Sequence, residues 1–137
     1  MNFLLDTNAC IAVINGRPEA VGLRLQKELE GGAQVLVPAI VAFELWYGVA
    51  KSRRREENSR RVSLFFAGPV HLLPFEAEDA QSAGRLRAAL EALGKPLGAY
   101  DLLIAGQALR RRLRLVTSNT SEFARVEALA WEDWAAR

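Results

Sequence analysis

Residues 3–6, with the sequence FLLD, form a short apolar run that ends on a carboxylate. Three consecutive apolar residues fit a strand buried on both faces of a parallel sheet better than a half-exposed strand. Thr7 and Asn8 follow directly, and we expect them to cap a helix. Ligands of open α/β sheets bind outside the carboxyl ends of the strands. Asp6 is therefore either a functional carboxylate at that edge or a helix cap.

Apolar runs and helical stripes alternate along the rest of the chain. The apolar runs predict strands at residues 35–37, 70–73 and 113–117, with a last strand within 129–134. Helices are predicted at 9–14, 19–30, after Pro38, at 76–93 and from about residue 100, and a charged loop over 51–61 leads into a further amphipathic helix. On the 76–93 helix the apolar stripe is Ala80, Ala83, Leu86, Leu90 and Leu93. Because each strand return is made through helix, residues 1–137 are predicted to form a single three-layer α/β/α domain with a mainly parallel central sheet.

Composition removes several classes of site and of protein. The 137 residues contain one cysteine, Cys10, and one histidine, His71. An internal disulfide, a cysteine-rich zinc site and a multi-histidine metal site are excluded, so any metal must be held by oxygen atoms. We expect Cys10 to be a small buried side chain and His71 to have a structural role. No signal peptide or membrane-length apolar stretch is recognised, and the expected location is the cytoplasm.

Acidic residues occur where they could meet at one rim of the predicted sheet. Asp6 ends the first strand, Asp101 opens a helix, Glu44 lies in the helix after Pro38, and Asn119 with Glu122 follows the fourth predicted strand. Two carboxylates about 5 Å apart repel by roughly 3 kcal/mol at an effective dielectric near 20. A divalent cation reverses that balance, and Mg²⁺ and Mn²⁺ prefer oxygen ligands. The pattern favours a metal site for phosphoryl chemistry.

Each of these residues also has a simpler interpretation. Asp101 would interact well with the dipole of its helix whatever its function. Glu44 could be the solvent edge of an amphipathic helix, and Asn119 and Glu122 lie in a segment of ordinary loop composition. Other function classes stay open at this point: a phosphatase or phospho-acceptor receiver on a doubly wound fold, or a binding module without catalysis.

Four motifs in the chain resemble those of a known family. They are the segments LLDTN at residues 4–8, FELWYG at 43–48, PLGAYDLLIA at 96–105 and LVTSNTSEF at 115–123. In this order and together they are similar to the PIN-domain ribonucleases, specifically VapC-type toxins. The resemblance implies an Mg²⁺- or Mn²⁺-dependent endoribonuclease that acts on RNA, with transfer RNA as the suggested substrate class.

The resemblance also implies roles for individual residues. The catalytic acids correspond to Asp6, Glu44 and Asp101, and Thr117 supports the site. Many relatives have Asp where Asn119 stands, so the fourth metal ligand is either the carbonyl oxygen of Asn119 or the carboxylate of Glu122. The family further implies a VapB-type antitoxin partner and a homodimer.

Basic runs and aromatic side chains suggest where partners bind. The runs Arg53, Arg54, Arg55 and Arg110, Arg111, Arg112 are candidates for contacts with RNA phosphates. Solvated helix faces compensated by Glu56 and Glu57 are the alternative for the first run. Aromatic residues cluster over 43–47 and 65–66; most are expected in the core, with a fraction exposed as an apolar groove for the antitoxin.

Overall fold

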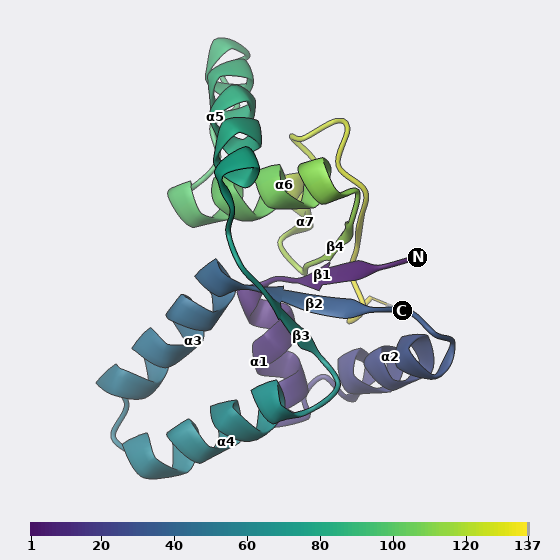
Figure 1. Ribbon diagram of the computed structural model, residues 1–137, viewed down its shortest axis with the longest axis vertical. Helices are drawn as coiled ribbons and strands as arrows, with labels where there is room; N and C mark the ends of the chain where they lie inside the picture. Colours follow the sequence, from purple (N-terminus) through teal and green to yellow (C-terminus); the bar gives the residue numbers. More distant parts are fainter. Residues whose placement is uncertain (137) are drawn as a thin grey trace.

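A five-stranded parallel sheet forms the centre of the computed structural model, which describes residues 1–136 (Figure 1). The strands are ordered β3-β2-β1-β4-β5, and every neighbouring pair is parallel. Their bounds are β1 (Phe3–Leu5), β2 (Val35–Pro38), β3 (His71–Leu73), β4 (Arg114–Val116) and β5 (Trp131–Glu132). The predicted parallel α/β sheet is confirmed.

Helices flank the sheet as two groups (Figure 1). The helices α1 to α4 lie below the sheet in this view, and α5 and α6 lie above it. Their bounds are α1 (Thr7–Asn15), α2 (Glu19–Glu30), α3 (Ala39–Lys51), α4 (Arg55–Ala67), α5 (Ala77–Ala92), α6 (Ala99–Arg111) and α7 (Thr120–Phe123). The three-layer arrangement agrees with the prediction from alternating strands and helices.

The strand order reverses direction between β1 and β4. The chain moves outward from β1 through β2 to β3, and then α5 and α6 carry it back to β4 on the other side of β1. Since parallel crossovers are right-handed, this reversal puts the two helix groups on opposite faces. Ligands of such sheets bind at the carboxyl ends of the strands where the order reverses. That point lies directly after Leu5 and Val116, which are paired in register.

The core follows the predicted apolar pattern over most of the chain. All three residues of β1 are fully buried, as a central parallel strand requires. The stripes of α2 and α3 bury Val21 and Leu25, and Val41 and Leu45. Cys10 is fully buried, which confirms that expectation, whereas His71 is exposed on β3.

The predictions for α4 and α5 were wrong in detail. Helix α4 begins at Arg55, inside the segment predicted as a charged loop. On α5 the ends of the predicted apolar stripe are exposed: Ala80 faces solvent and Leu93 is 67% exposed. The buried position at the start of α5 belongs instead to Asp79, whose side chain is completely inaccessible.

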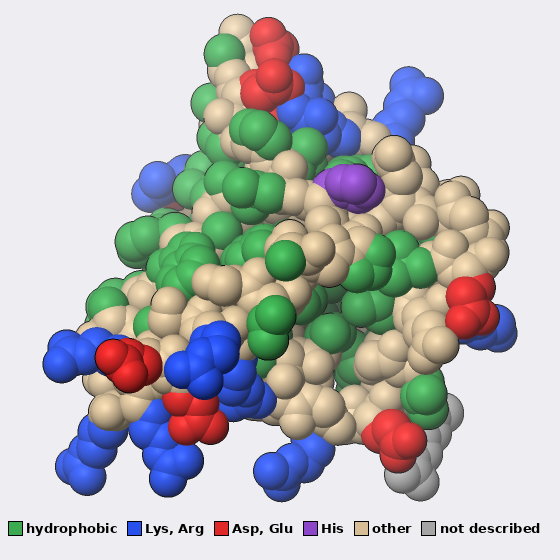
Figure 2. All heavy atoms as spheres, turned by 60° about the horizontal axis from the view of Figure 1, so that its bottom comes forward, with side chains coloured by type: hydrophobic (Ala, Val, Ile, Leu, Met, Phe, Trp, Pro, Cys, Tyr) green, Lys and Arg blue, Asp and Glu red, His purple; other side chains and the backbone are tan. Residues whose placement is uncertain are grey.

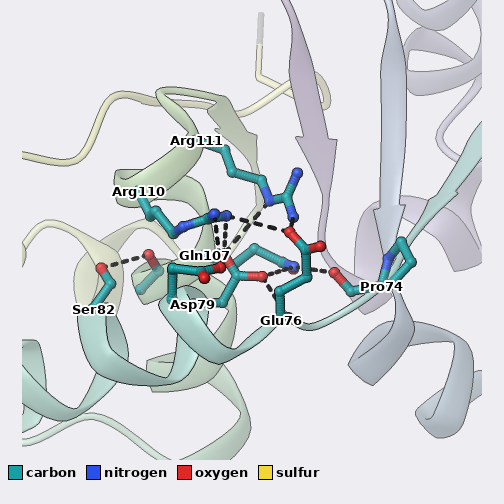
Figure 3. Close-up of polar contacts among 9 residues, drawn as sticks. Pro74, Glu76, Asp79, Ser82, Gln107, Arg110 and Arg111 are labelled. Carbon is teal, nitrogen blue, oxygen red and sulfur yellow. Dashed lines mark hydrogen bonds and ion pairs between the residues drawn. The ribbon is translucent and has the colours of Figure 1, made fainter.

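Asp79 is the centre of a polar network that joins α5 to α6 (Figure 3). Its carboxylate accepts hydrogen bonds from the Glu76 backbone N–H at 2.8 Å, Gln107 Nε2 at 3.0 Å and Arg110 Nη1 at 3.0 Å. Arg111 pairs with Glu76, and its Nε lies 3.5 Å from Asp79. Burial acts to raise the pKa of Asp79, but these donors and cations outweigh it and lower the pKa. The network fixes α6, the helix that carries Asp101.

A glycine allows the two helices to approach closely beside this network. A Cβ on Gly106 would lie 2.6 Å from the Cα of Ala83, so only glycine fits there. The hydroxyl of Ser82 donates a 2.8 Å hydrogen bond to the Gly106 carbonyl oxygen. Among the residues described, no helix has the length and hydropathy needed to cross a membrane.

Candidate functional site

Asp6 stands at the carboxyl end of β1, at the sheet reversal, and is the N-cap of α1. Its Oδ1 accepts a 2.9 Å hydrogen bond from the Ala9 backbone N–H, and its own N–H donates to the Val116 carbonyl oxygen at 3.1 Å. The expectation that Thr7 and Asn8 cap the helix was therefore wrong. The Asp-to-Ala9 spacing is that of an N-cap acceptor and its third helical N–H, which was the sequence signal for this role.

The pKa of Asp6 is raised from 3.8 to about 6. Burial is the main cause, since the residue is only 5% exposed and the charged form loses hydration. Hydrogen bonds from the Thr117 side chain and the Ala9 N–H lower the pKa, while the negative charges of Asp101 and Glu44 raise it. Asp6 is thus a carboxylate held at high energy in its ionised form.

Thr117 follows β4 and is buried next to Asp6 because β1 and β4 are paired strands. Besides its hydrogen bond with Asp6, the Thr117 Oγ1 accepts a 2.9 Å hydrogen bond from the Asn119 backbone N–H. One hydroxyl therefore positions the central carboxylate and also shapes the loop that carries Asn119 into α7.

Glu44 reaches the site from α3. The Thr7 Oγ1 donates a 2.7 Å hydrogen bond to Glu44 Oε1, across 37 positions of sequence. Glu44 is half-buried, and its charge acts on both Asp6 and Asp101. Thr7 therefore fixes the direction of this carboxylate, while the Asn8 side chain is exposed on α1.

Asp101 lies in the first turn of α6, and Glu122 lies in α7. Burial raises the pKa of Asp101, and the negative charges of Glu122 and Glu44 raise it further. The predicted acidic side chains thus converge from the starts or interiors of four helices on the carboxyl end of the sheet. For Asn119 the structure places the backbone beside Thr117.

The chemistry of this donor set fits a hard divalent cation. Burial and neighbouring negative charges raise the pKa values of Asp6 and Asp101, and none of the causes that shift them is a basic side chain. Within residues 1–136, no three acidic, histidine or cysteine side chains lie close enough together to hold a metal ion as they stand. The charges of Asp101 and Glu44 raise the pKa of Asp6, and those of Glu122 and Glu44 raise the pKa of Asp101, which is an arrangement that a cation would stabilise.

The predicted basic runs differ in how their guanidinium groups are used. Arg110 and Arg111 are bound to Glu76, Glu78 and Asp79 in the network between α5 and α6. Arg53, Arg54 and Arg55 lie at the start of α4 and are exposed, as is Arg112. RNA contacts remain a prediction, and the exposed cations at the start of α4 suit that role better than Arg110 and Arg111, which are held in ion pairs between α5 and α6.

Comparisons with known proteins place this geometry in a family. Residues 3–129 match the model of the PIN domain. The chain is 38% identical to the tRNA(fMet)-specific endonuclease VapC of Shigella flexneri and 36% identical to ribonuclease VapC2 of Rickettsia felis, covering 98% of this chain and 99% and 98% of those proteins. The chain is a PIN domain of the VapC family.

Solved structures agree with the assignment to the PIN-domain family. The chain resembles a chain in the crystal structure of VapBC2 from Rickettsia felis bound to a DNA fragment from their promoter. The TM-score is 0.90 at 35% identity, and the match covers 98% of this chain and 99% of that one. DNA-bound VapBC from Salmonella typhimurium gives a TM-score of 0.87 at 36% identity, with 98% of both chains covered. The family resemblance of the four motifs is confirmed.

Two features of the PIN domain were missing from the sequence interpretation. The contact between Thr7 and Glu44 depends on how α1 packs beside α3, and no local pattern encodes that packing. The exposure of Phe43, Trp46 and Tyr47, at 53%, 39% and 57%, was also missed in part, since most aromatic residues of that segment were expected in the core.

Proposed function

We propose that this PIN domain is the ribonuclease toxin of a toxin–antitoxin pair and hydrolyses phosphodiester bonds in RNA. The observation that carries the proposal is the convergence of Asp6, Glu44 and Asp101 at the strand-order reversal of the sheet. Relatives that cover nearly the whole chain are named ribonucleases, which supports the same activity here.

The proposed cofactor is Mg²⁺ or Mn²⁺, held by Asp6, Asp101 and Glu44 with either Asn119 or Glu122. When bound, such an ion would lower the pKa of an attacking water and stabilise the negative charge on the phosphoryl oxygens. Asp6 must lose its proton to serve as a ligand, and the hydrogen bonds from Thr117 and Ala9 favour that ionised form. Thr7 holds Glu44 in place through the 2.7 Å hydrogen bond.

Two helix N-termini add to this chemistry. Asp6 caps α1 and Asp101 lies in the first turn of α6, so the positive ends of both helix dipoles point toward the site. Helix N-termini favour anions such as phosphate groups. The scaffold would therefore help to bind the RNA backbone beside carboxylates that would otherwise repel it.

Transfer RNA is the proposed substrate class. Relatives from Shigella flexneri and Salmonella typhimurium are named tRNA(fMet)-specific endonucleases, and the chain is 38% and 36% identical to them. The toxin would act in the cytoplasm, where transfer RNA is found. Cleavage of purified transfer RNAs compared with messenger and ribosomal RNA tests this choice.

The proposed partner is a VapB-type antitoxin. A hollow of about 360 Å³ between α1, α3 and α4 has an apolar floor and includes Glu44 in its lining. Ile11, Ile14, Leu45, Val49 and Val62 supply the apolar part, and Arg61 at its edge bonds the Ile14 carbonyl oxygen at 3.0 Å. A segment laid in this hollow would end beside the carboxylates, which suits inhibition. The assembly of two toxin chains into a homodimer remains a prediction.

The decisive experiment compares wild type with Asp6→Asn for growth arrest and for RNA cleavage in Mg²⁺, Mn²⁺ or EDTA. We expect arrest and metal-dependent cleavage only with the wild type. Equal activity of the two proteins, or cleavage that survives EDTA, would overturn the mechanism.

The identity of the fourth ligand needs a second comparison. We expect Asn119→Ala to reduce the cleavage rate less than Asp101→Asn, because Glu122 already acts on Asp101 and can supply the missing charge. The reverse order of effects would assign the fourth position to Asn119.

A further inference from the structure

A second cavity lies beside the acidic site, between α1, the start of α2 and the last residues that the structure describes. Its volume is about 200 Å³, and residues 116–118 at the carboxyl end of β4 form one wall. Helix α1 forms another wall with Asn8, Ile11 and Ala12, which share a face because they are three and four positions apart. We call this space the β4 cavity.

The β4 cavity is connected to the acidic site through shared residues. Thr117 lines the cavity and is hydrogen-bonded to the side chain of Asp6. Asn8 lies two positions after Asp6, and Ser118 follows Thr117 directly; both side chains are exposed. A molecule in the β4 cavity would therefore lie next to the carboxylates that we propose as metal ligands, at the sheet edge where ligands of such folds bind.

The wall made by the end of the chain is held rigidly through Trp134. The indole N–H of Trp134 donates a 3.1 Å hydrogen bond to Glu132 Oε1, and its ring packs edge-to-face on Phe3 with centroids 5.2 Å apart. The guanidinium carbon of Arg24 lies 5.5 Å from the centroid of the same ring. A wall fixed in this way is preorganised, so binding need not order it.

Polar side chains of both hydrogen-bonding kinds join the apolar ones in the lining. Asp133 supplies a carboxylate, whose Oδ1 accepts a 2.9 Å hydrogen bond from the Ala135 N–H and is thereby fixed in direction. Asn8 offers a donor and an acceptor, and Arg17 offers donors. Apolar walls with a few placed polar groups are typical of a site for a small ring-shaped molecule.

We propose that the β4 cavity binds one base of the RNA next to the cleaved phosphodiester bond, and that Asp133 accepts a hydrogen bond from the exocyclic amino group of that base. The proposal rests on the ribonuclease function above and adds a base-selecting site to it. Bases splayed out of a strand are recognised by contacts with their faces and hydrogen bonds to their edges. Adenine, cytosine and guanine carry an amino group and uracil does not, so the site would select against uracil.

Size and lining favour a base over a protein segment as the occupant. The hollow between α1, α3 and α4, where we propose that the antitoxin binds, measures about 360 Å³, against about 200 Å³ for the β4 cavity. Ile11 lines both spaces and marks the boundary between them. The smaller space suits a single flat ring with polar edges, whereas an extended segment needs a longer groove.

The surrounding surface offers contacts for the rest of the strand. Figure 2 brings the side of α1 to α4 forward and shows Lys and Arg side chains along its lower edge. Such cations contact phosphates regardless of sequence. Selection of the base would therefore depend on the β4 cavity, and the cations would only hold the strand.

The test measures binding of adenosine, cytidine, guanosine and uridine to the full chain in EDTA, through the NMR signals of the backbone amides. We expect the three nucleosides with an amino group to bind more tightly than uridine and to shift the signals of Ala12, Ser118 and Ala135 in the lining. Asp133→Asn keeps an oxygen for the Ala135 N–H but presents an N–H donor to the base. It should weaken binding of the amino nucleosides by about 10-fold or more and reverse the preference toward uridine.

Ala12→Leu fills the β4 cavity and should abolish binding of all four nucleosides. Ala88→Leu, the same change at an exposed position of α5, is the matched control and should bind like wild type. Wild-type affinity of Ala12→Leu, or an unchanged base preference in Asp133→Asn, would overturn the proposal. So would a loss of antitoxin binding in Ala12→Leu without a loss of nucleoside binding, since the cavity would then belong to the protein partner.

These readouts do not need cleavage, so they separate the base site from the ribonuclease function. A wild type that cleaves RNA but binds no nucleoside in the β4 cavity would overturn this inference alone. A wild type that binds nucleosides there but cleaves no RNA in Mg²⁺ or Mn²⁺ would overturn the ribonuclease function instead.

Discussion

Asp6 combines two roles in one side chain. It caps α1 through the Ala9 N–H, and it is the buried centre of the acidic site. The hydrogen bond of the cap favours the ionised form of Asp6, whereas burial favours the protonated form. Burial has the larger effect, so the pKa of Asp6 is raised. A residue with only the capping role would be expected at the surface with its charge well hydrated.

The free energy of unfolding should increase when Asp6 is replaced by Asn. The folded chain holds the proton of Asp6 with a pKa of about 6 against 3.8 for the ordinary group, so the folded wild type loses stability as the pH rises from about 4 to 6. The full difference, about 3 kcal/mol at roughly 1.4 kcal/mol per pH unit, is present at pH 7. Asn keeps the cap, so Asp6→Asn should be the more stable protein at pH 7 in EDTA.

Denaturant unfolding at two pH values checks this prediction. The advantage of the Asn variant should nearly vanish at pH 4, where the wild-type carboxyl is mostly protonated in the folded state. Lower stability of Asp6→Asn at pH 7 would show that the carboxylate is stabilised in the free protein. That result would mean that the ionised Asp6 carboxylate does not destabilise the folded protein when no cation is bound.

The acidic residues of the site could be predicted from sequence because each has a local context. Asp6 ends an apolar strand, and Asp101 opens an apolar helix. The pairing of Thr7 with Glu44 could not be predicted in the same way. It depends on the packing of α1 against α3, which follows from the whole set of core contacts rather than from any short pattern.

At the scale of elements, α5 and α6 form a pair held by polar contacts as well as apolar ones. Asp79 was not predicted to be buried, because an acidic residue in the first turn of a helix ordinarily faces solvent. Its partners Gln107 and Arg110 lie 28 and 31 positions later in the sequence. The apolar stripe was therefore placed one residue too late at the start of α5, on the exposed Ala80.

Asp79→Ala should lower the free energy of unfolding by roughly 3–5 kcal/mol, because it leaves buried partners without their counter-charge. Glu78→Ala is the matched control. The Glu78 side chain is largely exposed and forms an ion pair with Arg110 at 3.1 Å, so its loss should cost less than about 1 kcal/mol. Urea unfolding of the two variants measures the difference. Equal effects would show that the network is not a major support of α6.

At the scale of the whole molecule, charge is distributed unevenly although the net charge is only +2. Arg53, Arg54 and Arg55 are exposed at the start of α4, on the same side of the sheet as α3. The two arginine runs look alike in sequence, and only the structure shows that Arg110 and Arg111 are held in the network around Asp79. The sequence therefore suggested that the arginine runs contact RNA phosphates but could not tell which of the two runs is free to do so.

Replacing Arg53 and Arg54 by Ala should weaken RNA binding and make it less dependent on salt. For a single strand, the slope of log K against log salt becomes shallower by about 0.7 for every phosphate that the protein no longer neutralises. Arg87→Ala, on the exposed side of α5 where it pairs with Glu91, is the control and should leave the slope unchanged. Equal slopes for the double variant and wild type would exclude this surface as the site that binds RNA phosphates.

The reversal of strand order has a consequence for how the protein is made. Asp6, Thr7 and Glu44 belong to the first half of the chain, while Asp101, Thr117 and Glu122 belong to the second. A nascent chain that has emerged only as far as α5 already has β1, β2 and β3 but lacks the central neighbour β4 and half of the acidic groups. Such a chain would lack the assembled acidic site, which can form only after β4 has emerged and paired with β1.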